Sequence, residues 1–411
     1  MRKFEVVIRT NGGTLTVNAP SSSVYHYNNL DTLTIQAVAA NSYHETGAVI
    51  NVANLTSGRI VVEAGGYMNT INAESSATVV VDGYVNTVTG ATATGNGYVP
   101  NNNGGTLGSA SSVDTKIKTI ADLHRFRDRV NVGQDFSLFT VTLASDLDLT
   151  GALWTPIGNS LHPFVGTFDG QNHVIKGLTN AGYESDDSNV TFTTTNSMAT
   201  GYAYGFFGIV GSLTETGDVT LKNVKMESVD INCVASNMCG ALVGADVKAA
   251  KNSSGNAING DYAGNITIEN VTVTGSIKAL DSVGGIAGKF YTNGRVTLSK
   301  CVNEASVSND ISANNFATSN YKVSGLLAYR NLGTTTIKDC VNKGAISKAG
   351  KGFGSAVANL GYKLAALEES FIHSGNSNTG SVSWKKADGT IDTSAKNHLF
   401  NYDEAGRVLD E

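Results

Sequence analysis

Clustered positive charge and long apolar runs are both missing from this sequence. Its 29 lysine and arginine residues are scattered and are outnumbered by 35 aspartate and glutamate residues, which gives a net charge of −6. A nucleic-acid-binding surface needs clustered lysine and arginine to contact phosphates, so we expect no nucleic-acid partner. No run of about 18 apolar residues occurs, so the sequence encodes no membrane-spanning helix.

A signal peptide is not visible either. Residues 1–13 begin with a basic tip, but Glu5, Arg9 and Thr10 interrupt the apolar core of roughly 7 to 15 residues that such a peptide requires. Because the chain opens directly in a strand-like segment, we expect that an export signal has been removed from it.

The sequence also lacks the patterns of metal and nucleophile sites. Its seven histidines never come within metal-ligand spacing of one another or of a cysteine, and no HExxH, GxSxG or P-loop string occurs. We therefore predict no metal site, no cofactor and no catalytic residue.

Asp146 and Asp148 form an acidic pair that could in principle carry chemistry. Two carboxylates on one strand face could bind Ca²⁺ or serve a glycosidase, which needs carboxylates about 5 to 10 Å apart. In an alternating strand, however, Leu147 and Leu149 point inward and both aspartates face water. A polysaccharide lyase would also need a basic residue beside acidic Ca²⁺ ligands, and Arg330 stands apart from any acid cluster in the sequence.

Glycine, in contrast, is abundant: 46 of 411 residues, about 11% against a usual ~7%. Threonine, valine, serine and asparagine dominate the rest, which favours strands and tight turns over helices. Asp169-Gly170, between two apolar segments, is typical of such a turn. The composition therefore predicts an all-β protein.

Two small residues bracketing an apolar pair recur five times. The last residues of these boxes are 36, 44, 40 and 30 positions apart, the order expected for one supersecondary unit per repeat. The boxes are Gly205-Phe-Phe-Gly208, Ala241-Leu-Val-Gly244, Gly285-Ile-Ala-Gly288, Gly325-Leu-Leu-Ala328 and Ser355-Ala-Val-Ala358.

Four further strings align between residues 140 and 360, each followed by a second alternating segment. With a period of two, the apolar residues of each string point inward and Thr, Lys, Glu and Asn point to solvent. The strings are Thr220-Leu-Lys-Asn-Val224, Thr267-Ile-Glu-Asn-Val271, Thr297-Leu-Ser-Lys-Cys301 and Thr336-Ile-Lys-Asp-Cys340. This pattern predicts about three strands per turn of a parallel stack, with polar insertions between strands at 246–264 and 309–320.

Residues 1–99 contain a second repeat system. Leu15-Thr-Val17, Leu33-Thr-Ile35, Ile60-Val-Val62 and Val79-Val-Val81 recur at intervals of 18, 27 and 19 residues. So short a unit buries its apolar face only by stacking on its neighbours, which predicts a smaller β-helix-like stack. The polar segment 100–116 is predicted to be a linker.

One helix is predicted after this linker. Thr119 can cap it, with Asp122 three residues on, and Gly133 stands where a left-handed stop is needed. Its apolar stripe consists of Leu123, Phe126 and Val130. We expect the helix to cover the open end of the following stack.

Four strings stand out in this region: WTPIGN at 154–159, PFVGTFDGQNHVIKGL at 163–178, GFFGIVG at 205–211 and VTLKNVKMESVDI at 219–231. Together they resemble bacterial surface proteins with GLUG-type repeats. The resemblance covers 117 to about 360. It implies a right-handed parallel β-helix, or solenoid, in an exported adhesin-like protein, here assigned to 117–365, with 366–411 as a C-terminal cap or tail. The chain departs from the family's glycine box at 324–328 and 355–358, so we expect distortion there.

The four cysteines are interpreted as free thiols. Cys301 and Cys340 occupy equivalent positions in consecutive repeats and should stack inward, one coil apart. Cys233 and Cys239 flank a short loop and could pair, since their spacing alone does not decide their geometry.

The favoured function is an extracellular, cell-surface adhesin or binding module that recognises a glycan or an extracellular protein. The alternatives are a carbohydrate-active enzyme, either a polysaccharide lyase or a glycoside hydrolase, and a purely structural stalk. Aromatic faces commonly hold sugar rings and protein loops. The candidate binding residues are tyrosines that recur about once per repeat: Tyr202, Tyr262, Tyr291 and Tyr329.

Overall fold

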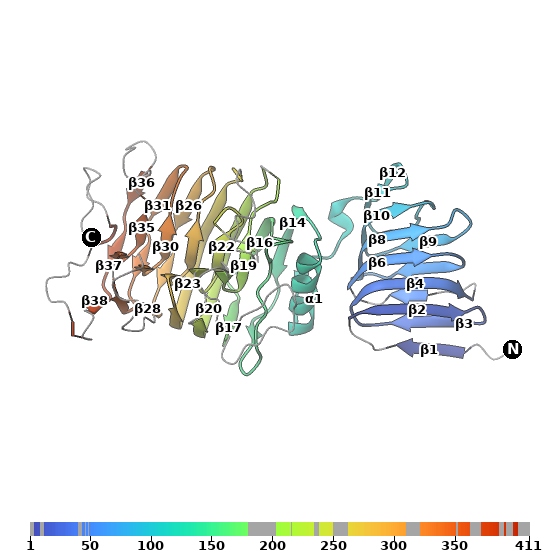
Figure 1. The fold of residues 1–411 in the computed structure, drawn as a ribbon, viewed down its shortest axis with the longest axis horizontal. Helices are drawn as coiled ribbons and strands as arrows, with labels where there is room; N and C mark the ends of the chain where they lie inside the picture. The colour runs from blue at the N-terminus through green and yellow to red at the C-terminus, as the bar shows by residue number, and fades with distance from the viewer. Residues whose placement is uncertain are drawn as a thin grey trace. The chain divides into compact units, whose positions relative to one another are not determined.

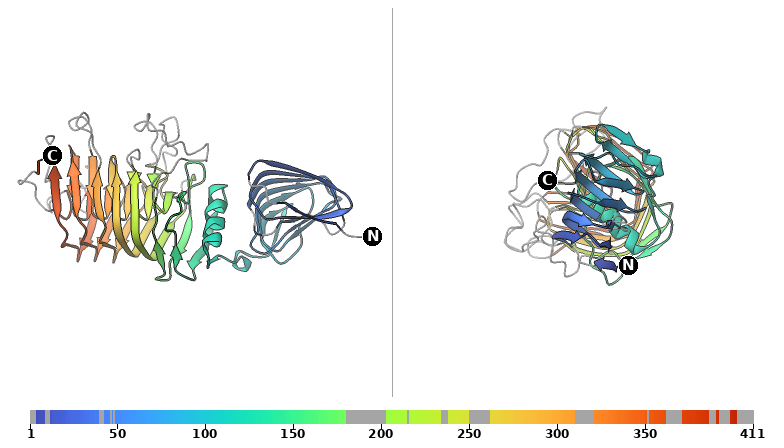
Figure 2. Two further views of the ribbon diagram at one scale, coloured as in Figure 1. Left: turned by 90° about the horizontal axis from the view of Figure 1, so that it is seen from below. Right: turned by 90° about the vertical axis from the view of Figure 1, so that its right-hand side faces the viewer.

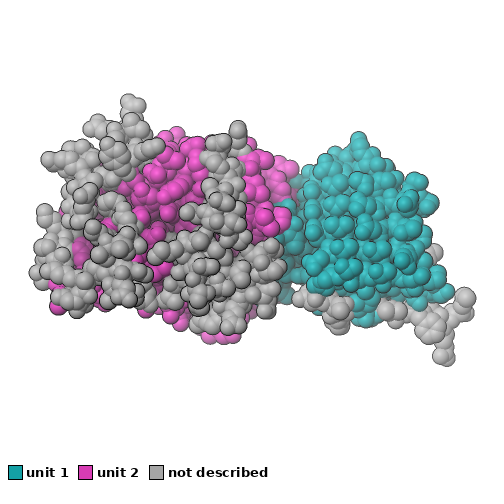
Figure 3. Space-filling model, in the orientation of Figure 1, with its two compact units in different colours: residues 1–116, 121–134 teal, residues 117–120, 135–411 magenta. Residues whose placement is uncertain are grey.

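A computed structural model describes residues 4–8, 12–39, 43–45, 47, 49–179, 203–214, 216–233, 238–249, 262–309, 321–350, 352–361, 371–385, 390–391 and 398–401. The chain divides into two compact units (Figure 3). The first comprises residues 1–116 and 121–134, and the second comprises 117–120 and 135–411.

In its described part, the first unit is built from two sheets whose strands alternate along the chain (Figure 1). One sheet contains β1 (Phe4–Ile8), β3 (Ser22–His26), β5 (Tyr43–Glu45), β7 (Arg59–Val62) and β9 (Thr78–Val81). The other contains β2 (Thr14–Ala19), β4 (Leu30–Val38), β6 (Val49–Leu55), β8 (Tyr67–Ala73), β10 (Tyr84–Thr89), β11 (Val99–Asn102) and β12 (Gly105–Leu107). Apolar side chains from both sheets form one core between them.

The repeat in residues 1–99 predicts the pairing of strands correctly within each sheet but not from one sheet to the other. Leu15 pairs with Leu33, and Ile60 pairs with Val79, as the strings predicted. Leu33, however, pairs with Ala53 and not with Ile60, because β7 belongs to the other sheet. The interval of 27 residues therefore combines one full coil with the passage to the second sheet.

The predicted linker begins as part of the first stack. Residues 99–107 form β11, which pairs in parallel with β10, and β12, which pairs antiparallel with β11. Asn102 is buried. Its side-chain oxygen accepts a hydrogen bond from the N–H of Ala93 at 2.7 Å, and its side-chain nitrogen donates one to the carbonyl of Ala93 at 3.0 Å. Backbone pairing can thus extend a sheet with polar residues, which composition does not reveal.

The predicted helix forms as α1 (Ile120–Asn131). Leu123, Phe126 and Val130 are buried, as the apolar stripe predicted. Gly133 has a φ of 102°, and the N–H of Gln134 donates to the carbonyl of Arg129, which closes the helix end with a left-handed glycine.

The helix contacts the first stack, since residues 121–134 group with the first unit, and its role in covering the open end of the following stack stays a prediction. Asn29 donates a hydrogen bond to Asp128 at 2.7 Å, and Arg125 Nε donates to the carbonyl of Gly47 at 2.9 Å. The charged side chains of the helix thus meet polar groups of the first stack, an arrangement that the apolar stripe alone does not predict.

The second unit consists of three parallel sheets in its described part (Figure 2). The largest contains β13 (Lys116–Ile117), β14 (Phe136–Leu143), β15 (Leu147–Asp148), β16 (Gly166–Asp169), β17 (Val174–Lys176), β20 (Val219–Cys233), β23 (Ile266–Ala279), β26 (Val296–Ser299), β27 (Val302–Asn303), β28 (Ser306–Asn309), β31 (Thr335–Lys338), β32 (Val341–Asn342), β33 (Ile346–Ala349), β36 (Phe371–Ser374), β37 (Ser377–Asn378) and β38 (Val382–Lys385).

Two smaller sheets complete each coil of this unit. One contains β18 (Ala203–Tyr204), β21 (Met238–Cys239), β24 (Ser282–Gly284), β29 (Tyr321–Ser324) and β34 (Gly352–Ser355). The other contains β19 (Phe207–Val210), β22 (Val243–Asp246), β25 (Ala287–Phe290), β30 (Leu327–Arg330) and β35 (Ala358–Leu360). The all-β prediction with parallel strands is therefore confirmed.

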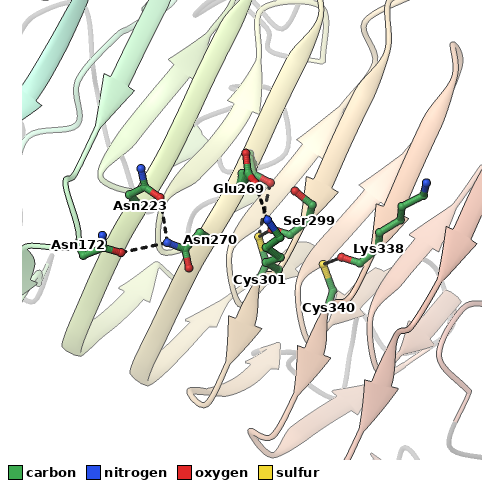
Figure 4. Close-up of polar contacts among 10 residues, drawn as sticks. Asn172, Asn223, Glu269, Asn270, Ser299, Cys301, Lys338 and Cys340 are labelled. Atoms are coloured by element: carbon green, nitrogen blue, oxygen red, sulfur yellow. Dashed lines mark hydrogen bonds and ion pairs between the residues drawn. The ribbon is translucent and has the colours of Figure 1, made fainter.

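The four aligned threonine strings pair in the predicted register. Thr220, Thr267, Thr297 and Thr336 lie opposite one another on successive strands. The fourth residue of each string has a left-handed backbone, with φ between 53° and 55°, and turns the chain at the same point in every coil: Asn223, Asn270, Lys300 and Asp339. Asparagine and aspartate tolerate this conformation better than most residues. Figure 4 shows Asn270 donating to Asn172 at 3.0 Å and Asn223 at 2.9 Å.

The small-apolar-small boxes form the corner between the two smaller sheets. The backbone N–H of Leu242 donates to Ile286, and that of Ile286 to Leu326, so the apolar residues stack inside the core. In the last box the register places Ala356, and not Ser355, opposite Gly325, because Ser355 pairs with Ser324. Pairing keeps one offset from Ser324 to Leu327, and the ladder shifts by one residue only beyond Leu327 and Ala358, between β30 and β35.

The stack also continues beyond residue 365, where a cap or tail was expected. Strands β36, β37 and β38 pair in parallel with β31, β32 and β33. Phe400 forms a further parallel bridge to Ala358. Asparagine side chains bond between successive coils on this side, since Asn303 donates to Asn342 at 2.8 Å and Asn342 donates to Asn378 at 2.7 Å.

All four cysteines are free and buried. Cys301 and Cys340 point inward one coil apart, and the Sγ atoms donate to the carbonyls of Ser299 and Lys338, both at 3.3 Å (Figure 4). Burial raises the pKa of Cys301 well above its usual value. A hydrogen bond from Cys301 lowers the pKa of Cys340, but that side chain is also fully buried.

We expect Cys301 and Cys340 to stay reduced and unreactive in the native protein, because reagents cannot reach them and little Cys301 thiolate forms. Mass spectrometry after a brief exposure to a thiol reagent should show labelling only in denaturant. Rapid native labelling of both residues, or a mapped disulfide between them, would contradict this prediction.

Candidate functional site

The predicted strip of four tyrosines does not form as a unit. Tyr202 lies outside the described residues. Tyr262 is 0% exposed, and its hydroxyl donates to the carbonyl of Gly217 at 2.7 Å. Burial is the main reason why the pKa of Tyr262 rises. Tyr262 is therefore a core residue that joins neighbouring coils, and its assignment as a binding residue is wrong.

Tyr291 and Tyr329 do come together. Their ring centroids are 6.0 Å apart, with the rings at 65° to each other. Lys289 pairs directly with Tyr329 across β25 and β30, and Tyr291 follows Lys289 by two residues. Both tyrosines are half-buried. Burial raises the pKa of each to about 12, so both rings are neutral phenols at physiological pH.

Two lysines lie against these rings. The Nζ of Lys289 is 5.1 Å from the Tyr291 centroid and 5.9 Å from that of Tyr329, and the Nζ of Lys322 is 5.3 Å from Tyr329. Burial lowers the pKa of both lysines, whereas the charge of Asp281 opposes this shift. We call Lys289, Tyr291, Lys322 and Tyr329 the tyrosine–lysine cluster; its members come from β25, the turn that follows it, β29 and β30.

The turn that carries Tyr291 is fixed from one side by Asp246. This side chain is fully buried at the end of β22. One carboxylate oxygen accepts hydrogen bonds from the N–H groups of Tyr291 at 2.7 Å and Thr292 at 2.6 Å, and the other accepts from Ala249 at 2.7 Å. Burial is the main influence on Asp246 and raises its pKa.

Arg330 fixes the same turn from the other side. Its fully buried guanidinium donates to the carbonyls of Thr292 at 2.9 Å and Gly294 at 3.0 Å. Burial lowers the pKa of Arg330 to about 10, and the charge of Asp246 opposes the shift. The sequence predicted that Arg330 stands apart from any acid cluster, and the structure adds that one acid, Asp246, holds the same turn because stacking brings the two side chains there.

Asp246 was not singled out from the sequence, and Arg330 was considered only as a base without an acid cluster, although a signal for their role in this turn was present. The register places Asp246 opposite Val210, and Arg330 opposite Phe290. These are inward positions, so a charged residue at either one departs from the apolar pattern of the repeat. Lys289 and Lys322 gave no comparable signal, because both occupy outward positions where lysine is ordinary.

The acidic pair near the start of the second unit behaves as predicted. Leu147 and Leu149 are buried, whereas Asp146 and Asp148 are exposed. Asp146 contacts His173 at 2.9 Å, and Asp148 contacts the Lys176 ammonium at 3.5 Å.

The predicted turn at Asp169-Gly170 is also confirmed. The N–H of His173 donates to the carbonyl of Gly170 at 2.8 Å, and Gln171 and Asn172 have positive φ.

Two further features concern the described residues. They contain no group of three or more His, Cys, Asp or Glu side chains placed to hold a metal ion. Within the same ranges, no helix is both long enough and apolar enough to cross a membrane.

No protein-family model matches this sequence, and a comparison with curated proteins finds no match. Among solved structures, the chain is similar to a crystal structure described as "a putative immunoglobulin A1 protease from Bacteroides ovatus". The two share 18% identity over 69% of this chain and 80% of that chain, with a TM-score of 0.45.

Proposed function

We propose that this chain is a binding module of an exported, cell-surface adhesin with GLUG-type repeats, built as a right-handed parallel β-helix. Parallel strands that pair in register from coil to coil support the solenoid. Crossovers between parallel strands are right-handed in nearly all proteins, which supports the handedness. A stiff stack that presents loops along its length suits adhesion to an extracellular glycan or protein.

The observation that carries this proposal is the tyrosine–lysine cluster. Two aromatic rings and two ammonium groups meet on outward positions of adjacent coils. Aromatic faces bind sugar rings and apolar parts of peptides, and lysines add hydrogen-bond donors and charge. The buried Asp246 and Arg330 hold the supporting turn in place, so little order has to be gained on binding.

Replacing Tyr291 and Tyr329 together by alanine should abolish retention on immobilised mucin and polysaccharide mixtures, because the variant loses both aromatic faces. Retention is measured by affinity chromatography, with the melting temperature checked for each variant. Tyr25→Ala, which removes a half-buried tyrosine of the first unit, is the matched control and should be retained like the parent. Equal retention of the double variant and the parent would sink the proposal.

Binding without cleavage is the second part of the proposal. Incubation of the protein with acidic polysaccharides should release no reducing or unsaturated ends. Release of such ends would instead identify a carbohydrate-active enzyme. A parent protein that binds none of the immobilised materials would favour the structural stalk.

A further inference from the structure

Lys289 has an unusual environment for a lysine. It is half-buried, and its ammonium lies over the rings of Tyr291 and Tyr329. Among the residues that the structure describes, this ammonium has no hydrogen-bond acceptor and no ion-pair partner. An ammonium group has three donors, and taking them partly out of water without an oxygen partner is costly.

The charges around the cluster favour an anion. Lys289, Lys322 and Arg330 carry positive charge; the charge of Asp281 acts on both lysines, and that of Asp246 acts on Lys289 and Arg330. Asp246 is already committed to three backbone N–H groups. One carboxylate from a ligand would therefore supply the oxygen partner that the Lys289 ammonium lacks among the described residues.

We infer that the tyrosine–lysine cluster binds a carboxylate-bearing sugar, of the uronic acid type, with Lys289 contacting the carboxylate and a tyrosine ring contacting the sugar face. The inference rests on the proposed glycan-binding function and specifies its ligand class. The rings and the ammonium lie within one sugar's reach of each other, since both centroids are within 6 Å of the Lys289 Nζ. A neutral sugar would leave the Lys289 ammonium without its partner.

The test measures affinity for polygalacturonate and for the same polymer after its carboxyl groups have been reduced to alcohols. The parent protein should bind the acidic polymer at least tenfold more tightly than the reduced one. Lys289→Met should lose at least tenfold in affinity for the acidic polymer. Lys300→Met, an exposed lysine paired with Glu269, makes the same change in net charge and should bind like the parent.

Each other outcome has a defined meaning. If the parent binds both polymers equally, or Lys289→Met binds like the parent, the inference is overturned while glycan binding stands. If polyglutamate binds as tightly as polygalacturonate, the ligand class is an acidic peptide and the sugar assignment is wrong. If the parent binds neither polysaccharide nor any immobilised glycan, the proposed function fails as well.

Discussion

Val271→Asp is expected to destabilise the second unit by several kcal/mol. Val271 is 0% exposed in the middle of β23 and pairs with Val224 of the preceding coil. A carboxylate at this position would have apolar neighbours in the coil, and burying an unpaired charge costs several kcal/mol even after the structure relaxes. Thermal unfolding followed by circular dichroism should show a melting temperature lowered by about 10 °C or more.

Glu269→Ala is the matched control two residues away. Glu269 points outward (Figure 4). Its carboxylate contacts the Lys300 ammonium at 3.2 Å. A surface ion pair of this kind contributes roughly 0 to 1 kcal/mol, so its loss should leave the melting temperature nearly unchanged. Equal melting temperatures for the two variants would mean that the strand register in this coil is wrong.

Arg330→Met is expected to destabilise the second unit by several kcal/mol, because it leaves buried carbonyl groups without their donors and a buried carboxylate without its compensating charge. The substitution removes the donors that hold the carbonyls of Thr292 and Gly294 and leaves the carboxylate of Asp246 without its opposing charge. Asp246→Ala should have an effect of similar size, because it leaves three backbone N–H groups without their acceptor.

Arg295→Met is the control for this pair, since Arg295 is exposed and lies just beyond the same turn. It should change stability by less than about 0.5 kcal/mol. Urea unfolding of both single variants and the double variant completes a thermodynamic cycle. Because both side chains fix one turn, the double variant should lose clearly less than the sum of the two single losses. Strict additivity would show that Asp246 and Arg330 act independently.

Several elements could be predicted from the sequence because their signals are local or repeat exactly. Alternation with a period of two placed Leu147 and Leu149 inside and the neighbouring aspartates outside. The apolar stripe and Gly133 located α1 and its end. Equivalent positions in consecutive repeats placed Cys301 and Cys340 one coil apart and inside.

Other elements could not be predicted, since they depend on contacts between distant segments. Asn102 belongs to a strand because its backbone pairs with β10, although the polar composition of segment 100–116 predicted a linker. The sequence did not show that Tyr262 is enclosed, because the segments that bury it come from other coils.

The sequence by itself determined the all-β class, the parallel repeat and the inward face of most strands, because stacked coils repeat the same alternation of apolar and polar residues. Only the tertiary structure decided which charged and aromatic side chains lie next to one another. Asp246 and Arg330 are far apart in the sequence, yet they hold the same turn because successive coils bring them there. The tyrosine–lysine cluster has the same origin, since strand pairing sets Lys289 beside Tyr329 and no local pattern records that register.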